Sequence, residues 1–301
     1  MIIYFFYRVY IMEIEDTFCE VFDGCFARLI VTASDKKRLK RAVYGSTSLP
    51  STVFGEAEGG VEGWLSRDRT PDERIGAIIQ IWVSKKGDSR RVLDIELSKR
   101  IRQGILVVPT TRIFNALDSD ERIDIWNRVG HCGDGYEWEE ERFGRKMINI
   151  PLMMGEFLIE RWLGAGDGFM GGNLWFYCDT IENALQIGDR AVSAIERVEG
   201  AITPFDICSA GSKVETNYPE IGPTTNHPYC PTLRGRIPDS KVPEGVGSIP
   251  EIVINARRIE EIKDAMRSAI RAVDGMDGLL GISAGNYGGK LGSHRIYLRD
   301  L

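Results

Sequence analysis

The chain has 301 residues, and its 38 lysines and arginines against 44 aspartates and glutamates give a formal net charge of −6. With 43% apolar and 27% charged residues, the composition is that of a folded globular protein and excludes a disordered one. We expect no nucleic-acid partner, since no surplus of positive charge is available to neutralise phosphates. The length favours two domains over one.

The first eleven residues, MIIYFFYRVYI, are apolar except for Arg8. The run is shorter than the ~20 residues that span a bilayer, and it lacks a basic start and a cleavage site, so we expect no membrane partner. Two interpretations stay open. The run is a first strand, because Ile, Tyr, Phe and Val favour strands, or Met12 is the natural start. We expect a cytoplasmic protein.

The first half alternates apolar runs with helical patterns. Strands are expected over Phe26–Ala33, Ala77–Ser84 and Gly104–Pro109, and helices over Asp35–Val43 and Asp88–Gln103.

The second half repeats this order more clearly. Thr180 stands at an N-cap position, and the apolar residues after it are spaced as on one face of a helix that ends before Gly200. A second amphipathic helix is expected from Ile259 to Val273, and a long Pro- and Gly-rich connection from Ser209 to Ser248. The expected strands are Gly172–Asp179, Ala201–Pro204, Pro250–Ala256 and Gly278–Ala284.

Each half therefore runs strand–helix–strand, connector, strand–helix–strand, which is the split βαβ arrangement of a ferredoxin-like sandwich. The sequence predicts an α+β fold with two ferredoxin-like lobes in tandem, the N-terminal lobe over residues 1–148 and the C-terminal lobe over residues 149–301. Helices cover one face of each sheet, so we expect lobe packing or subunit contact to cover the other.

Two glycine-rich segments partly match nucleotide-binding motifs. Gly166, Gly168 and Gly171 match GxGxxG, but a strand follows where a dinucleotide site needs a helix, so we expect a loop between strands. Ala284–His294 has four glycines and Lys290 without the P-loop spacing. It is either a binding loop at the carboxyl end of a strand or a plain turn.

The six cysteines form no CxxC pair, and the three histidines show neither HExxH nor HxH spacing. We therefore expect free thiols in a reducing cytosol and no metal site.

Glu251 opens an otherwise apolar strand, PEIVIN. Either it is a strand-end glutamate that points to water, or it is a carboxyl whose pKa is raised so that it donates a hydrogen bond. Composition does not choose between these interpretations.

Several short segments occur together in a definite order. They are IEDTF at Ile14–Phe18, GRK at Gly144–Lys146, GEF at Gly155–Phe157, GGN at Gly171–Asn173, GSKV at Gly211–Val214, YCPT at Tyr229–Thr232, PEGV at Pro243–Val246, EIVIN at Glu251–Asn255 and AGNYGGKLG at Ala284–Gly292. In these segments the chain resembles the formylmethanofuran–tetrahydromethanopterin N-formyltransferase family. The resemblance runs from about Met12 to Leu301 and is stronger in the second half.

The resemblance implies transfer of a formyl group between formylmethanofuran and N5 of tetrahydromethanopterin, in one-carbon metabolism such as methanogenesis. It implies a homotetramer with two ferredoxin-like lobes per chain and a cleft near a subunit interface. It also implies that the two C1 carriers, methanofuran and tetrahydromethanopterin, bind as substrates, with no metal and no tightly bound cofactor.

The resemblance also implies roles for particular residues. Glu251 matches the family's key glutamate, expected here as a protonated carboxyl that donates to the oxyanion of a tetrahedral intermediate. Lys213 either faces an acidic substrate tail or is solvated. The residues expected near the substrates are Asn226, Ser212, Lys213, Gly285, Asn286, Gly288 and Gly289.

Two loops depart from the family's pattern. Pro204-Phe205 is followed by Asp206 where the family has a glycine pair, and Ser48–Gly60 keeps only Ala57-Glu58-Gly59. We therefore carry two hypotheses: an active formyltransferase, and a catalytically inactive paralogue that binds a C1 carrier or a partner complex.

Overall fold

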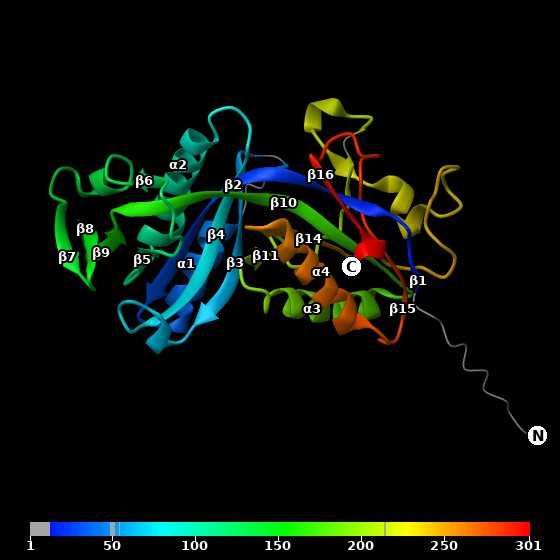
Figure 1. Ribbon diagram of the computed structural model, residues 1–301, viewed down its shortest axis with the longest axis horizontal. Helices are drawn as coiled ribbons and strands as arrows, with labels where there is room; N and C mark the ends of the chain where they lie inside the picture. The colour runs from blue at the N-terminus through cyan, green and yellow to red at the C-terminus, as the bar shows by residue number, and fades with distance from the viewer. Residues whose placement is uncertain (1–12, 49–51, 54, 214) are drawn as a thin grey trace, which may run out of the picture.

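The molecule has two halves, and each half has its own hydrophobic core. Two long strands run from one half into the other (Figure 1). The computed structural model describes residues 13–48, 52–53, 55–213 and 215–301. The strand considered for the first eleven residues lies outside the described residues. The joining strands are β2 (Phe18–Ala33) and β10 (Trp162–Cys178).

The described residues form a mixed α/β fold with one large sheet and few helices. None of the helices in these ranges is long and apolar enough to cross a membrane. The helices are α1 (Lys36–Thr47), α2 (Ser89–Arg100), α3 (Ile181–Ile195) and α4 (Ile259–Val273). The remaining strands are β1 (Glu13–Ile14), β3 (Ala57–Leu65), β4 (Ile75–Ser84), β5 (Arg112–Asn115), β6 (Arg122–Asp124), β7 (Trp138–Arg142), β8 (Arg145–Leu152), β9 (Gly155–Glu160), β11 (Ala201–Ile202), β12 (Ser212–Lys213), β13 (Thr224–Thr225), β14 (Glu251–Ala256), β15 (Leu279–Ser283) and β16 (His294–Tyr297).

Both halves use the same element order and the same strand neighbours. The first runs β2–α1–β3–β4–α2–β5, and its strands lie in the order β5–β2–β4–β3. The second runs β10–α3–β11–β14–α4–β15, and its strands lie in the order β15–β10–β14–β11. Within the described ranges, these strands belong to one 14-stranded sheet, and β12 and β13 form a separate pair.

The sheet is continuous because β2 and β10 pair with each other where the halves meet. Their antiparallel register runs from Ala27 opposite Ala165 to Phe22 opposite Met170. Strand β2 also pairs with β4 in one half and β16 in the other. Strand β10 also pairs with β6 in one half and with β14 and β15 in the other. At ~3.3 Å per residue, each strand is roughly 50 Å long.

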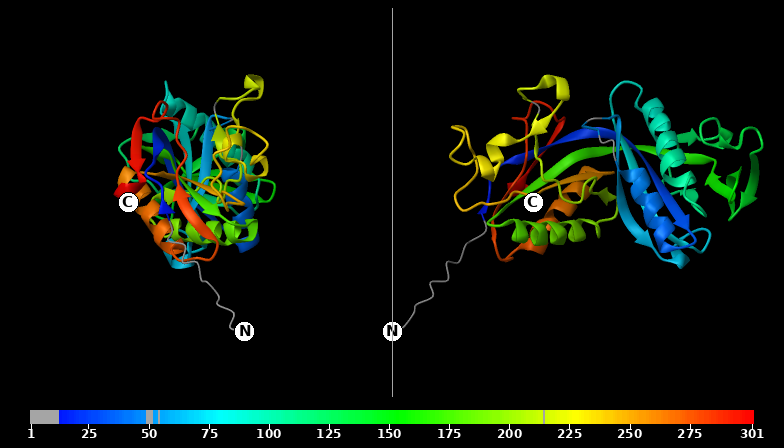
Figure 2. Two further views of the ribbon diagram at one scale, coloured as in Figure 1. Left: turned by 90° about the vertical axis from the view of Figure 1, so that its right-hand side faces the viewer. Right: turned by 180° about the vertical axis from the view of Figure 1, so that it is seen from behind.

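Three of the four described α-helices begin at a capping side chain, which confirms the N-cap predicted at Thr180. Asp35, Asp88 and Thr180 each accept a hydrogen bond from the backbone N–H three residues on, which satisfies one otherwise unpaired donor. Helices α3 and α4 lie side by side against the sheet of the second half (Figures 1 and 2). Their buried faces carry the apolar residues of the predicted stripes.

The strand predicted at Gly104–Pro109 is wrong. Residues Ile101–Leu106 continue α2 as a π-helical turn, and Ile105 is fully buried. A Cβ on Gly104 would lie 2.7 Å from the Ser46 backbone, so glycine allows this turn to press against α1. A short apolar run fits a buried helical turn as well as a strand, and helix packing decided the outcome.

The loop predicted around Gly166, Gly168 and Gly171 is also wrong, because all three glycines lie inside β10. They allow close packing: a Cβ on Gly168 would fall 2.6 Å from the Trp82 ring. Strand β3 was missed for a related reason. Its glycines look like loop residues, yet Gly59 and Gly60 pack tightly against Ile81 and Ile202.

The boundary expected after residue 148 falls inside β8. Strands β7, β8 and β9 form a meander that extends the first half's sheet through parallel pairing of β9 with β5. The segment around Tyr136–Arg145 therefore contains a strand and a hairpin turn.

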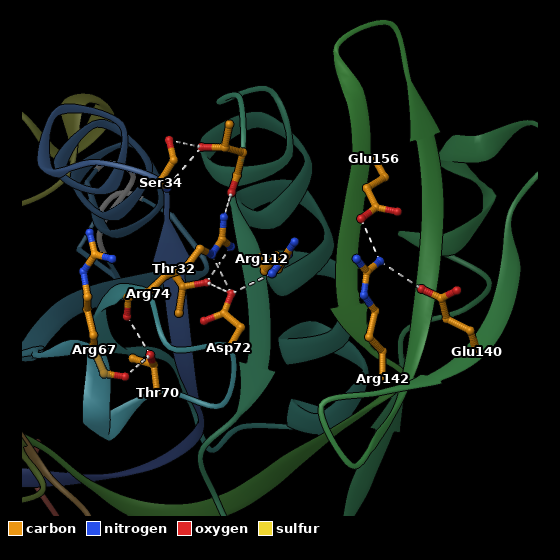
Figure 3. Close-up of polar contacts among 11 residues, drawn as sticks. Thr32, Ser34, Arg67, Thr70, Asp72, Arg74, Arg112, Glu140, Arg142 and Glu156 are labelled. Carbon is orange, nitrogen blue, oxygen red and sulfur yellow. Dashed lines mark hydrogen bonds and ion pairs between the residues drawn. The ribbon is translucent and has the colours of Figure 1, made fainter.

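A buried carboxylate organises the far end of the first half. The side chain of Asp72 is fully buried and accepts hydrogen bonds from Thr32 (2.8 Å) and Arg74 (2.6 Å), as Figure 3 shows. Arg112 approaches the same carboxylate oxygen at 3.2 Å. Asp72 thereby ties the β3–β4 connection to β2 and β5.

A second buried carboxylate, Glu62 on β3, links the halves. Its carboxylate accepts hydrogen bonds from Nε and Nη2 of Arg28 at 2.7 and 2.6 Å, and from the backbone N–H of Gly200 in the other half at 3.1 Å. Burial alone would raise the pKa of Glu62, but the hydrogen bonds from Arg28 and Gln80 outweigh it and lower the pKa.

We predict that Glu62→Ala lowers the free energy of unfolding by about 2–4 kcal/mol, because the largely buried Arg28 loses its bidentate partner and keeps only the exposed Glu199, 3.8 Å away. Urea denaturation measures the change. Asp264→Ala, which removes an exposed ion pair with Arg267, is the control and should cost under about 1 kcal/mol. Equal effects of the two substitutions would contradict a stabilising role for Glu62.

Candidate functional site

Glu251 stands at the first position of β14, held by strand pairing on both sides. Its backbone exchanges hydrogen bonds with Cys208 (2.8 and 2.9 Å), and it lies opposite Trp175 of β10 in the sheet register. Its carboxylate Oε1 accepts a hydrogen bond from the indole Nε1 of Trp175 at 2.9 Å. The position of the side chain is therefore set by two other segments of the chain.

The environment of Glu251 favours its neutral form. Burial raises the pKa of this carboxyl, and the hydrogen bonds from Trp175 and Cys208 oppose the shift without cancelling it. Of the two interpretations of this residue, the geometry supports the sheltered carboxyl with a raised pKa. In its protonated form, a carboxyl of this kind can donate a hydrogen bond.

Two cavities meet at Glu251, Trp175, Tyr229 and Asn226, which line both. One, of about 370 Å³, is walled mainly by apolar residues of α3 and of the chain around β14. The other, of about 390 Å³, is polar and lies where the long connection before β14 and the loop after β15 run side by side (Figures 1 and 2). Each is large enough to hold part of an organic substrate.

The polar cavity gathers most of the residues expected near substrate from distant parts of the chain. Its walls include Glu251, Asn226, Lys213, Gly285, Asn286 and Gly288. Gly289 is not among the residues that line it and lies in the turn after Gly288. The backbone of Ser212 pairs with Thr225 in the β12–β13 ladder.

Backbone N–H groups of the glycine-rich loop after β15 donate to a carboxylate of the protein itself, Glu20 on β2. The Glu20 carboxylate accepts four of them, from Tyr287 and Gly289 on Oε1 (2.8 and 2.6 Å) and from Leu291 and Gly292 on Oε2 (2.9 and 2.6 Å). Burial would raise the pKa of Glu20, but these four donors lower it. The loop is thus a wall held in shape by a carboxylate, and these donors are not available to a ligand.

Several cavity residues were not anticipated from the sequence. Trp175 and Tyr229 contact each other edge to face, with ring centroids 4.7 Å apart, and the Lys241 ammonium lies 5.8 Å from the Tyr229 ring centre. Glu15, Asn173 and Ser283 add polar groups to the same wall. Only Glu15, Asn173 and Tyr229 fell within segments of the family resemblance, and none of the six stands out by local pattern.

All six cysteines carry free thiols, three of them fully buried. In the part of the chain that the structure describes, no three His, Cys, Asp or Glu side chains gather as a metal site would require.

Comparison with known proteins identifies the family. Residues 8–152 match the family model described as formylmethanofuran-tetrahydromethanopterin formyltransferase, and residues 155–301 match the model described as FTR, proximal lobe. A formyltransferase-like protein of Archaeoglobus fulgidus is 60% identical over 96% of both chains. The chain belongs to the formylmethanofuran–tetrahydromethanopterin formyltransferase family.

Relatives with the unqualified formyltransferase name are less similar to this family member. Those of Methanothermobacter thermautotrophicus and of Archaeoglobus fulgidus are 43% and 40% identical, each over 96% of this chain and 98% of the relative. Archaeoglobus fulgidus therefore has both a formyltransferase and a formyltransferase-like protein.

Solved structures of formyltransferases share the fold. The Methanosarcina barkeri formyltransferase superposes with a TM-score of 0.88 at 37% identity, covering 96% of this chain and 98% of that one. A chain of the formyltransferase/hydrolase complex of Methylorubrum extorquens, solved with methylofuran, superposes with a TM-score of 0.86 at 35% identity, covering 95% and 96%.

We predict that Glu20→Gln lowers the free energy of unfolding of this formyltransferase-family protein by about 1–3 kcal/mol near neutral pH, because an amide nitrogen cannot accept the loop's N–H groups. The folded pKa of Glu20 is lowered, so its contribution is complete above the ordinary value of 4.5 and is lost as pH falls through the lowered pKa. Urea denaturation from neutral to acidic pH should show the wild-type and variant curves converging at low pH. Glu13→Gln, on the exposed strand β1, is the control, and curves that stay parallel would contradict the role given to Glu20.

Proposed function

We propose that this chain transfers a formyl group between formylmethanofuran and N5 of tetrahydromethanopterin, with Glu251 as the acid that stabilises the oxyanion. The observation that carries the proposal is a carboxyl with a raised pKa at the junction of an apolar and a polar cavity, in a chain that matches a formyltransferase over 96% of its length.

The reaction requires only positioning and charge stabilisation. The acceptor nitrogen attacks the formyl carbon, a new C–N bond forms, and the π pair of the C=O group moves onto oxygen. The neutral Glu251 carboxyl donates a hydrogen bond to that oxygen, which stabilises the charge that develops there. The pair then returns, the bond to the donor nitrogen breaks, and the donor nitrogen takes up a proton as the acceptor nitrogen releases one.

The two cavities suit a reaction between two large carriers. Substrates held on either side of Glu251 would meet at its carboxyl, and this positioning supplies much of the catalysis of such transfers. Both carriers act as substrates in this proposal, and no tightly bound cofactor takes part. The Methylorubrum extorquens complex, solved with methylofuran, supports a furan carrier as one of them.

We further propose the lobe architecture and cellular setting that the resemblance implies. The repeated βαββαβ order and the repeated strand order support two ferredoxin-like lobes that divide near residues 148–155. Six free thiols support a reducing, cytoplasmic setting. The homotetramer is testable by light scattering of the purified protein.

The alternative is an inactive paralogue that binds a C1 carrier or a partner complex. It is favoured by the presence of both a formyltransferase and a formyltransferase-like protein in Archaeoglobus fulgidus, the latter being much more similar to this chain. Calorimetry that detects binding of formylmethanofuran or tetrahydromethanopterin, together with an assay that detects no formyl transfer, would support this alternative.

We predict that purified protein transfers the formyl group in a spectroscopic assay of formyl-pterin formation, and that Glu251→Gln lowers kcat by about 10²–10³-fold, because the amide N–H is a much weaker acid than the carboxyl O–H and stabilises the oxyanion less. Glu220→Gln, which changes an exposed glutamate outside both cavities, is the control and should retain wild-type kcat. Full activity of the Glu251→Gln variant would show that the catalytic assignment is wrong.

A further inference from the structure

Trp175 occupies the junction of the two cavities. It lies in β10 directly opposite Glu251, is 5% exposed, and lines both cavities. Its indole Nε1 donates to Glu251 Oε1 at 2.9 Å. The proposed reaction gives this side chain no part, although with Cys208 it is one of the two side chains that hydrogen-bond the proposed acid.

The chemistry of the indole restricts the protonation of its partner. An indole N–H is a donor only, so Oε1 must be the accepting oxygen. A neutral carboxyl has one O–H, and its carbonyl oxygen is the better acceptor, so the proton belongs on Oε2. We propose, resting on the function above, that Trp175 is a positioning residue: it fixes the Glu251 proton on Oε2, and this O–H is the group that donates to substrate.

A glycine makes room for the indole. A Cβ on Gly285 would lie 2.7 Å from Trp175 Cζ2, closer than side chains approach. The Gly285 backbone cannot move away easily, because Asn173 accepts its N–H at 2.6 Å and donates to its carbonyl at 3.1 Å. The role of Gly285 is therefore to admit the indole. The Tyr229 ring also contacts Trp175, with ring centroids 4.7 Å apart.

The first test is kinetic. Trp175→Phe keeps an aromatic ring but removes the N–H, and we expect kcat to fall about 10–100-fold with KM changed less than about 2-fold, as for a group acting only in the transition state. The lost donor favoured the anion, so the pKa of Glu251 rises further and the alkaline limb of the kcat–pH profile moves to higher pH. A fall in kcat with an unmoved limb would overturn the proposal.

The second test is a double-mutant cycle. Gly285→Ala should lower kcat about 10-fold in the wild-type background, since the methyl group displaces the indole. In the Trp175→Phe background it should cost less than about 2-fold, because phenylalanine has no atom at the Cζ2 position. Additive effects would overturn the proposal. Trp162→Phe, at the far end of β10 and 36% exposed, is the matched control and should leave kcat unchanged.

A readout independent of turnover separates this inference from the proposed function. The C=O stretch of the protonated Glu251 carboxyl, identified by its loss in Glu251→Gln, can be titrated by difference infrared spectroscopy. We expect its midpoint to move to higher pH in Trp175→Phe and not in Trp162→Phe, whether or not the protein turns over. An unmoved midpoint overturns the inference, whereas a moved midpoint without activity in the wild type overturns only the proposed function.

Discussion

The antiparallel pairing of β2 with β10 is the constraint on which the rest of the structure depends. Each strand is long enough to enter both hydrophobic cores, so the register between Phe22 and Met170 sets the position of one half relative to the other. A slip of one residue would turn every side chain of β10 to the opposite face of the sheet. Trp175 would then leave Glu251, and the junction between the cavities would be lost.

Glu20 and Glu251 show how different surroundings shift the pKa of the same residue type in opposite directions. Glu20 accepts four backbone N–H groups, which lower its pKa, and it acts as a fixed anion that shapes the loop after β15. Glu251 has fewer donors, and burial raises its pKa. The first glutamate holds the cavity wall and the second supplies the acid, in accordance with the rule that opposed pKa shifts assign opposed roles.

Much of the fold was predictable because it depends on local signals. The N-cap at Thr180, the apolar stripe of α4 and the strand that begins near Glu251 follow from residues close together in the chain. The failures came where distant packing overrides local preference. Gly104 and Gly168 were misassigned because each glycine is selected by the close approach of another segment, Ser46 and Trp82 respectively.

The sequence by itself determined the order of the elements, the family, and Glu251 as the candidate acid. Only the tertiary structure decided that this carboxyl is sheltered and accepts a hydrogen bond from an indole. It also decided that the loop's N–H groups donate to Glu20 and that Gly285 makes room for Trp175. The reason is physical: burial and hydrogen bonding of a side chain depend on partners far away in the chain. Trp175 is 76 residues from Glu251, and Glu20 is 267 to 272 residues from the groups that it binds.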